Sequence, residues 1–179
     1  NDLLLGVSIP PFQVNGLKNV SFRVLNAYLD WSDLANPSGL QFPAGYNSPY
    51  LEAGQANMWH GFYFQRLEVS LPSSFARKND RGRITMGVEN MILDDQGFTG
   101  KVFAENVLTT GDMSGWAYTI DRVGIELVIN QVKGFELAGV ISVPKLTARN
   151  GETAAQFGYL AQRGADGNYI FAVRIENNL

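Results

Sequence analysis

The chain has 179 residues, with 14 Lys and Arg against 17 Asp and Glu, which gives a formal net charge of −3. This length suits one domain with a sizeable core, and a hydrophobic content of 45% excludes general disorder. Zero cysteines and one histidine exclude disulfides, thiolate sites and multi-histidine metal sites, while the mildly acidic balance without a basic tract argues against nucleic acid.

In chain order, apolar residues alternate with polar ones over 20–24, 84–90, 125–129 and 170–175. A period of two predicts β-strands, and several of these segments are apolar on both faces, which suggests burial between two layers. The one helix candidate, Tyr50–Met58, is short and interrupted by Gly54. Turn residues punctuate the strands at Asn15-Gly16, Asp95–Gly97, Asn150-Gly151 and Asp166–Asn168. The predicted class is all-β.

Three short motifs recur along the chain in the same order. The sequence Val7–Pro10 returns as Val69–Pro72 and Ile141–Pro144, and we expect each proline to end its strand. The segment 24–30 matches 88–94, with Asp30 and Asp94 expected to start Asx turns. The segment from Trp59 to Leu71 likewise matches that from Trp116 to Leu127. The pattern predicts a degenerate repeat of roughly 60–70 residues.

The repeat divides the chain into units 1–58, 59–133 and a partial 134–179, joined in one continuous folded body. A unit of this kind needs its neighbours to complete its core. Two architectures meet that need: a β-solenoid, and tandem antiparallel β-sandwich modules. Gly-Phe pairs at residues 61–62, 97–98 and 134–135 favour the solenoid slightly, whereas the Asn-Gly and Asp-Gly turns favour hairpins.

The run Asn90–Gly100, the segment Gly115–Asp121 and the stretch Gly134–Pro144 carry a resemblance. Together they resemble the degenerate β-rich modules of very large bacterial proteins, some encoded near extracellular contractile injection systems. The likeness is one of pattern and spans about residues 59–175. It implies a structural or surface-associated role in a large assembly, outside the cell or on a particle, and it supplies no catalytic residue.

The sharpest binding candidate is the segment 31–58, where Trp31, Tyr46 and Tyr50 lie among prolines and glycines. Aromatic rings on a stiffened loop suit the recognition of a sugar or a protein partner. The alternative is that the rings cap the end of the core.

Other polar groups have more ordinary explanations. His60 lacks a nucleophile motif beside it, so a structural role is expected. Asp94 and Asp95 could offer oxygen ligands to Ca²⁺, but a turn capped by an aspartate is the favoured interpretation. Two acid pairs suit glycoside hydrolysis only if the fold brings them together: Glu68 with Glu89, and Asp121 with Glu136. We interpret the basic cluster 77–83 as a solvated loop between strands, and an anion-binding site is the alternative.

The chain starts without Met and carries no targeting signature, so we expect a segment of a longer chain or a trimmed product. No apolar stretch reaches the roughly 18 residues of a membrane-spanning helix, and we expect no membrane span, metal or cofactor. We predict a non-enzymatic scaffold module that acts by protein–protein contact. A carbohydrate- or receptor-binding module is the alternative, and a polysaccharide-cleaving enzyme is the least favoured.

Overall fold

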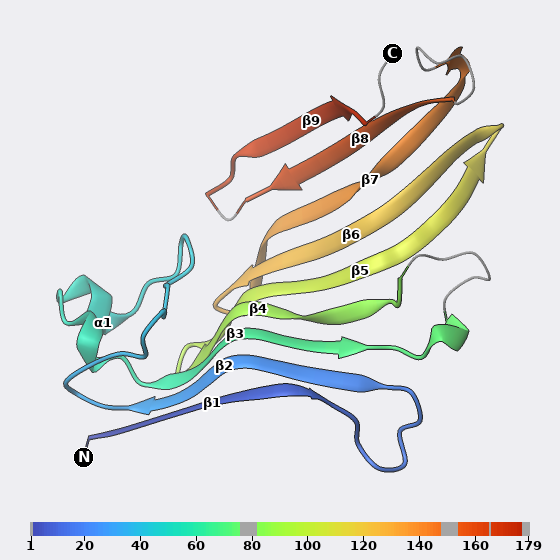
Figure 1. Ribbon diagram of the computed structural model, residues 1–179. Coiled ribbons are helices and arrows are strands. Elements are labelled where there is room, and N and C mark those ends of the chain that lie inside the picture. Colours follow the sequence, from blue (N-terminus) through green and yellow to red (C-terminus); the bar gives the residue numbers. More distant parts are fainter. Residues whose placement is uncertain (1, 76–81, 148–153, 165, 177–179) are drawn as a thin grey trace.

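The computed structural model describes residues 2–75, 82–147, 154–164 and 166–176. Within these residues nine strands form a single antiparallel sheet in which every strand pairs with its neighbours in sequence (Figure 1). The all-β prediction is confirmed, and the sheet is open, with β1 and β9 as its two edges. The strands are β1 (Leu3–Phe12), β2 (Ser21–Trp31), β3 (Gly61–Ser70), β4 (Thr85–Asp94), β5 (Gly97–Met113), β6 (Trp116–Val128), β7 (Gln131–Thr147), β8 (Ala154–Arg163) and β9 (Tyr169–Ile175).

The strands predicted from alternation fall in β2, β4, β6 and β9. The helix candidate becomes α1 (Pro49–Glu52) and a 3-10 turn η1 (Ala56–Met58), separated by Gly54 at φ +72°. Ser48 caps α1, since its hydroxyl accepts a hydrogen bond from the backbone N–H of Leu51. A second 3-10 turn, η2 (Ser73–Phe75), follows β3.

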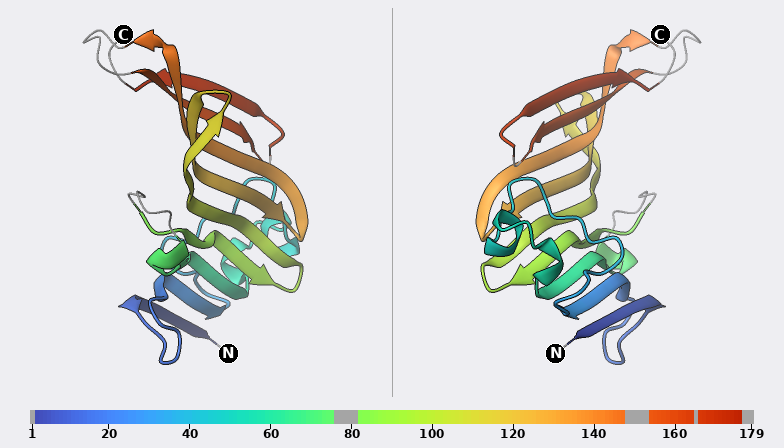
Figure 2. Two further views of the ribbon diagram at one scale, coloured as in Figure 1. Left: turned by 90° about the vertical axis from the view of Figure 1, so that its right-hand side faces the viewer. Right: turned by 90° about the vertical axis from the view of Figure 1, so that its left-hand side faces the viewer.

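The sheet is strongly twisted (Figure 2), and two asparagines mark matching irregularities in it. Asn26 in β2 has φ +47° and Asn90 in β4 has φ +46°, in the left-handed region that asparagine tolerates better than most residues. The register shifts by one residue beside each of them, toward β1 at Asn26 and toward β5 at Asn90. These are β-bulges, which bend a strand and increase its twist.

The segments 24–30 and 88–94 share more than these asparagines. Each ends in an aspartate whose Oδ1 accepts a hydrogen bond from a backbone N–H two residues on: Asp30 from Ser32 at 2.9 Å and Asp94 from Gln96 at 3.0 Å. Both predicted Asx turns are therefore present. The division into units 1–58, 59–133 and 134–179 stays a prediction.

The expectation that proline ends each strand is right after β3 and wrong in two other places. β1 continues past Pro10 to Phe12, and β7 continues past Pro144 to Thr147. β1 is an edge strand, so a missing N–H donor on its outer side costs no ladder bond. Pro144 lies in a bulge where the pairing jumps from Val143 to Thr147.

Two predicted loop features fall wholly or partly outside the described residues. The Asn150-Gly151 turn is not described, and neither is the basic cluster up to residue 81. Of that cluster Arg83 is described: its guanidinium donates to the backbone carbonyl of Leu71 at 2.6 Å and to that of Asn19. Arg83 therefore links the connection between β3 and β4 to the connection between β1 and β2.

Candidate functional site

The long connection between β2 and β3, residues 32–60, folds over one end of the sheet (Figure 1). Its aromatic residues complete the main core cluster with Tyr63, Ile92 and Val128 from three strands. Trp59 is 1% exposed, and the ring of Phe42 stands edge-on to it with 5.9 Å between ring centroids. The connection therefore covers the core cluster at this end of the sheet.

Tyr46 belongs to this core. Its ring stacks on Phe42 with centroids 5.5 Å apart, and its hydroxyl donates a hydrogen bond to Asp94 Oδ2. Trp59 Nε1 lies 2.9 Å from the same carboxylate oxygen and 2.9 Å from the hydroxyl of Tyr46. Burial, reinforced by the neighbouring carboxylate, raises the pKa of the Tyr46 hydroxyl.

Asp94 is therefore the anchor of the loop. One of its oxygens holds the Asx turn, and the other accepts hydrogen bonds from Tyr46 and Trp59. Both carboxylate oxygens are thus engaged by donors of the protein itself, which accounts for an acid at this turn without a bound cation. Among the described residues, no group of three or more His, Asp or Glu is arranged to hold a metal ion.

Trp31 and Tyr50 are brought together, away from Tyr46. Both flank His60: its ring centroid lies 6.3 Å from that of Trp31, in a stacked arrangement, and 6.2 Å from that of Tyr50. His60 Nε2 lies 3.1 Å from Asp33 Oδ1. These rings border a hollow of about 380 Å³ whose other wall includes Phe62 and the Asp94–Asp95 pair. Trp31 is 57% exposed, so its ring is accessible from solvent.

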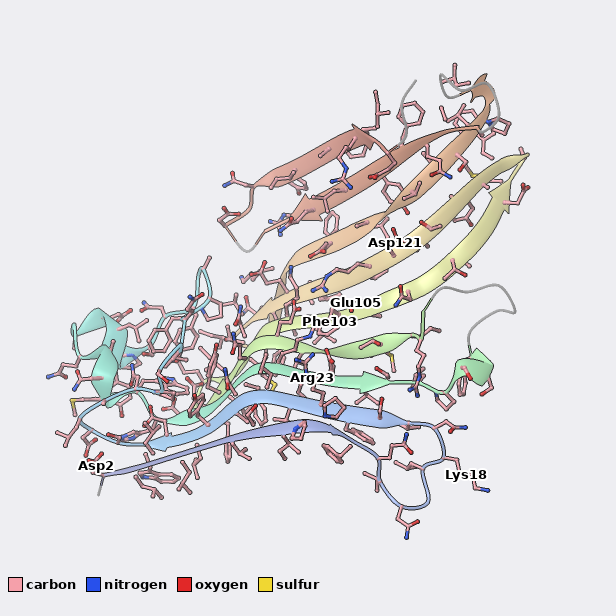
Figure 3. All side chains as sticks on the ribbon, in the orientation of Figure 1. Asp2, Lys18, Arg23, Phe103, Glu105 and Asp121 are labelled. Carbon is pink, nitrogen blue, oxygen red and sulfur yellow. The ribbon has the colours of Figure 1, made fainter. Side chains whose placement is uncertain are left out.

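A charged ladder crosses the middle of the sheet on the face that the loop covers at its end. It alternates cations and carboxylates over β2 to β7, and Phe42 and Pro43 of the loop border it beside Glu89 and Lys101. Figure 3 shows three labelled residues of this region, Arg23, Phe103 and Glu105. The ladder consists of Arg23, Arg66, Lys101 and Arg122 with Glu68, Glu89, Glu105 and Glu136.

Phe103 lies at the centre of the ladder and is 2% exposed. The guanidinium carbons of Arg66 and Arg122 stand 4.3 and 4.7 Å from its ring centroid. Phe103 pairs with Gly87 on one side and Gly124 on the other, so neither neighbouring strand places a side chain over the ring. Cation–π contacts on an otherwise unflanked ring thus fix both arginines in place.

The acid pairs considered for hydrolysis are largely committed to this ladder. Arg66 Nε donates to Glu68 at 2.6 Å, and Glu89 is bound by both Arg66 and Arg122. Glu136 forms ion pairs with Lys101, whose Nζ lies 2.6 Å from Oε2, and with Arg122, whose Nε lies 3.0 Å from Oε1. Four cations thus face four carboxylates through the ion pairs of this ladder.

The opposite face of the sheet is apolar. Directly paired residues of an antiparallel sheet point to the same face, so the register defines rows across it. One row crosses all nine strands with apolar side chains only, and a second does so from β1 to β7. The first is Phe12, Phe22, Val69, Met86, Ala104, Val123, Leu137, Ala161 and Phe171; the second is Ile9, Val24, Leu67, Val88, Val102, Ile125 and Phe135.

We call these two adjacent rows the apolar face. Among the described helices and strands, each strand contacts only its sequence neighbours, and none of the side chains of the apolar face is buried. Val102, in the central strand, is 41% exposed. A parallel row of five apolar residues, including Leu29, Phe62 and Leu93, leads from β1 to β5 and ends at the hollow beside Trp31.

Sequence reasoning singled out the loop aromatics and missed the apolar face. The alternation in each strand was visible, but the rows exist only once nine strands are set in register. No helix within the described residues has the length and apolar character needed to cross a membrane. No protein-family model, curated protein or solved structure is detectably similar to this chain.

Proposed function

We propose that this chain is a non-enzymatic structural module of a large bacterial surface, secreted or particle-associated protein, and that it acts by protein–protein contact. The observation that carries the proposal is the apolar face, two adjacent rows of apolar side chains that no described helix or strand covers. A contiguous apolar surface of this extent marks an interaction site, because leaving it in water is unfavourable and promotes aggregation.

The apolar face also bears on the architecture of the protein. A sheet with one charged face and one apolar face suits one layer of a two-layer body that packs its apolar face inward, and sheets stack about 10 Å apart with interdigitating side chains. The antiparallel order of sequence neighbours and the Asp95–Gly97 hairpin support the sandwich alternative over the β-solenoid. In this proposal the second layer comes from outside the described residues.

The charged ladder supports a scaffold role rather than hydrolysis. A glycosidase needs one carboxyl that stays protonated and a second that is free to act as nucleophile or base. Here Glu68, Glu89 and Glu136 each form ion pairs with two cations, so their carboxylate oxygens are engaged by the protein's own side chains. The ladder is better suited to hold six strands in register.

The test of the scaffold role uses the cells that naturally make the protein. Native extracts are separated by size, and the chain is located with an antibody. We expect wild type in high-mass fractions, Val102→Glu on the apolar face to move to low mass, and Leu34→Glu to behave as wild type. Leu34 is a matched control, an apolar residue 73% exposed on the loop. Wild type at low mass, or the same distribution for both variants, would contradict the proposal.

A second function is favoured by one specific observation, the hollow between Trp31, Tyr50 and His60. An exposed indole beside carboxylates is the usual arrangement for stacking on a sugar ring and hydrogen-bonding its hydroxyls. Retention on immobilised glycans tests it: Trp31→Ala should lose retention with little change in Tm, because the ring is exposed. A fall in Tm of several degrees would instead assign Trp31 to the fold.

A further inference from the structure

The apolar face lacks charge over most of the sheet, and this limits what can cover it. From β1 to β7 its two rows hold only aliphatic, aromatic and methionine side chains, and the first charged residue in register is Arg163 in β8. The charged groups of the same strands, such as Arg66 and Glu89, belong to the ladder on the other face. A basic or acidic partner would find no complementary charge here, whereas an equally apolar surface would fit.

The accessible surface of the whole chain is larger than that of a compact monomer of its mass. The accessible surface is 11022 Å², whereas a compact monomer of the same mass exposes about 8,600 Å². The excess is about 2,400 Å² per chain. Two chains that each buried half of it would form an interface of about 2,400 Å² in total, within the size range of obligate homodimers.

We infer that the apolar face is covered by the same face of a second copy of this chain, in a two-fold symmetric β-sandwich. An isologous interface must be complementary to itself, and an uncharged apolar surface meets that condition without any repulsion between like charges. This inference rests on the proposed protein-contact role and names its partner.

Position within the sheet supports this pairing. The rows run through the middle strand β5, at Val102 and Ala104, and not only along an edge. Two copies can therefore overlap over most of their strands, as the layers of a sandwich do, with their mean strand directions within about 30° of each other. The loop 32–60 and the charged ladder then lie on the two outer surfaces of the dimer.

Sedimentation equilibrium of the purified 179-residue chain tests the inference. We expect a dimer of twice 19.7 kDa. Val102→Glu should raise the dimer Kd at least about a hundredfold, because two unpaired carboxylates would enter the interface. Val102→Thr keeps the β-branched shape and adds only a hydroxyl, so it should weaken the dimer less while folding normally by circular dichroism. Leu34→Glu should leave the Kd unchanged.

Each outcome decides the question. A chain that is monomeric at every concentration, or a dimer that Val102→Glu and Val102→Thr leave intact, would overturn the inference. Growth beyond the dimer that survives both variants would also overturn it, since it would place self-association at the exposed edges β1 and β9. A monomeric chain that still runs in high-mass native fractions would refute the second copy alone and leave the scaffold role standing.

Discussion

Asp30 and Asp94 occupy equivalent positions in two similar segments, yet the structure predicts that they differ in their contribution to stability. Asp94 accepts hydrogen bonds from the backbone of Gln96 and from the buried side chains of Tyr46 and Trp59. Asp30 accepts one from Ser32, and its second oxygen is buried with no hydrogen-bond partner among the described residues. Replacement by alanine should therefore have unequal effects.

The magnitudes follow from these contacts. A hydrogen bond to a charged group contributes about 1.5–3 kcal/mol, and the bonds of one acceptor are not additive. Tyr46 and Trp59 can still bond to each other in Asp94→Ala, so we expect a loss of about 3 kcal/mol rather than the sum. Asp30→Ala removes one turn bond and also an unfavourable buried charge, so its loss should stay near or below about 1 kcal/mol.

Urea denaturation followed by tryptophan fluorescence measures both losses, at one fixed protein concentration because association shifts apparent stability. Asp95→Ala, at an exposed position next to Asp94, is the control and should stay within about 0.5 kcal/mol of wild type. Equal losses at Asp30 and Asp94, or a loss below about 1 kcal/mol at Asp94, would refute the assignment of Asp94 as the anchor of the loop.

Three further comparisons of variants test the sheet. Gly87→Ala should lower the free energy of unfolding by more than about 2 kcal/mol, because its Cβ would lie 2.1 Å from the carbonyl oxygen of Leu67. Gly124→Ala is the control and should be tolerated, because the nearest atom to its Cβ would be 3.4 Å away. Equal melting temperatures for the two variants would contradict this expectation. Asn90→Val should lower the free energy of unfolding by about 1–2 kcal/mol and Asn90→Gly should change it little, because the backbone φ at this position is +46°. Equal losses for the two variants in urea titration would count against the bulge. Burial raises the pKa of Asp30 above 3.8, so the protonated form stabilises the fold below that pH and this stability is lost as pH rises through the folded-state pKa. Asp30→Asn should therefore melt higher than wild type at pH 7 and lose that advantage below pH 3.8, and a pH-independent difference would exclude this explanation.

Alternation within single strands was enough to predict the fold class. The segments 20–24 and 84–90 became β2 and β4 because branched and aromatic residues at a period of two leave few alternatives. The Asx turns at Asp30 and Asp94 were also predictable, since they need only neighbouring backbone. Local chemistry was thus readable from the sequence.

Features that depend on register were not readable. Arg66 contacts Glu105, a residue two strands away, and the sequence of neither strand predicts that ion pair. The prolines likewise could not be interpreted without the strand order, because Pro10 is tolerated within β1 where that strand is an edge of the sheet. Tyr46 looked like a recognition residue by composition, but its hydroxyl lies where Asp94 and Trp59 meet in the core.

The loop and the apolar face lie on opposite sides of the sheet. The connection 32–60 covers one end of one face, the charged ladder links the strands beside it, and no described helix or strand covers the other face. The chain has no cysteine of its own, so a single introduced thiol reports its surroundings cleanly.

Thiol labelling in native material tests the central idea, protein coverage of the apolar face, most directly. Maleimide modification of Val102→Cys is compared with that of Leu34→Cys, first in the native assembly and then in urea. We predict protection of position 102 in the assembly, full modification of it in urea, and rapid modification of position 34 in both. Equal rapid modification of the two positions in the native assembly would contradict the account.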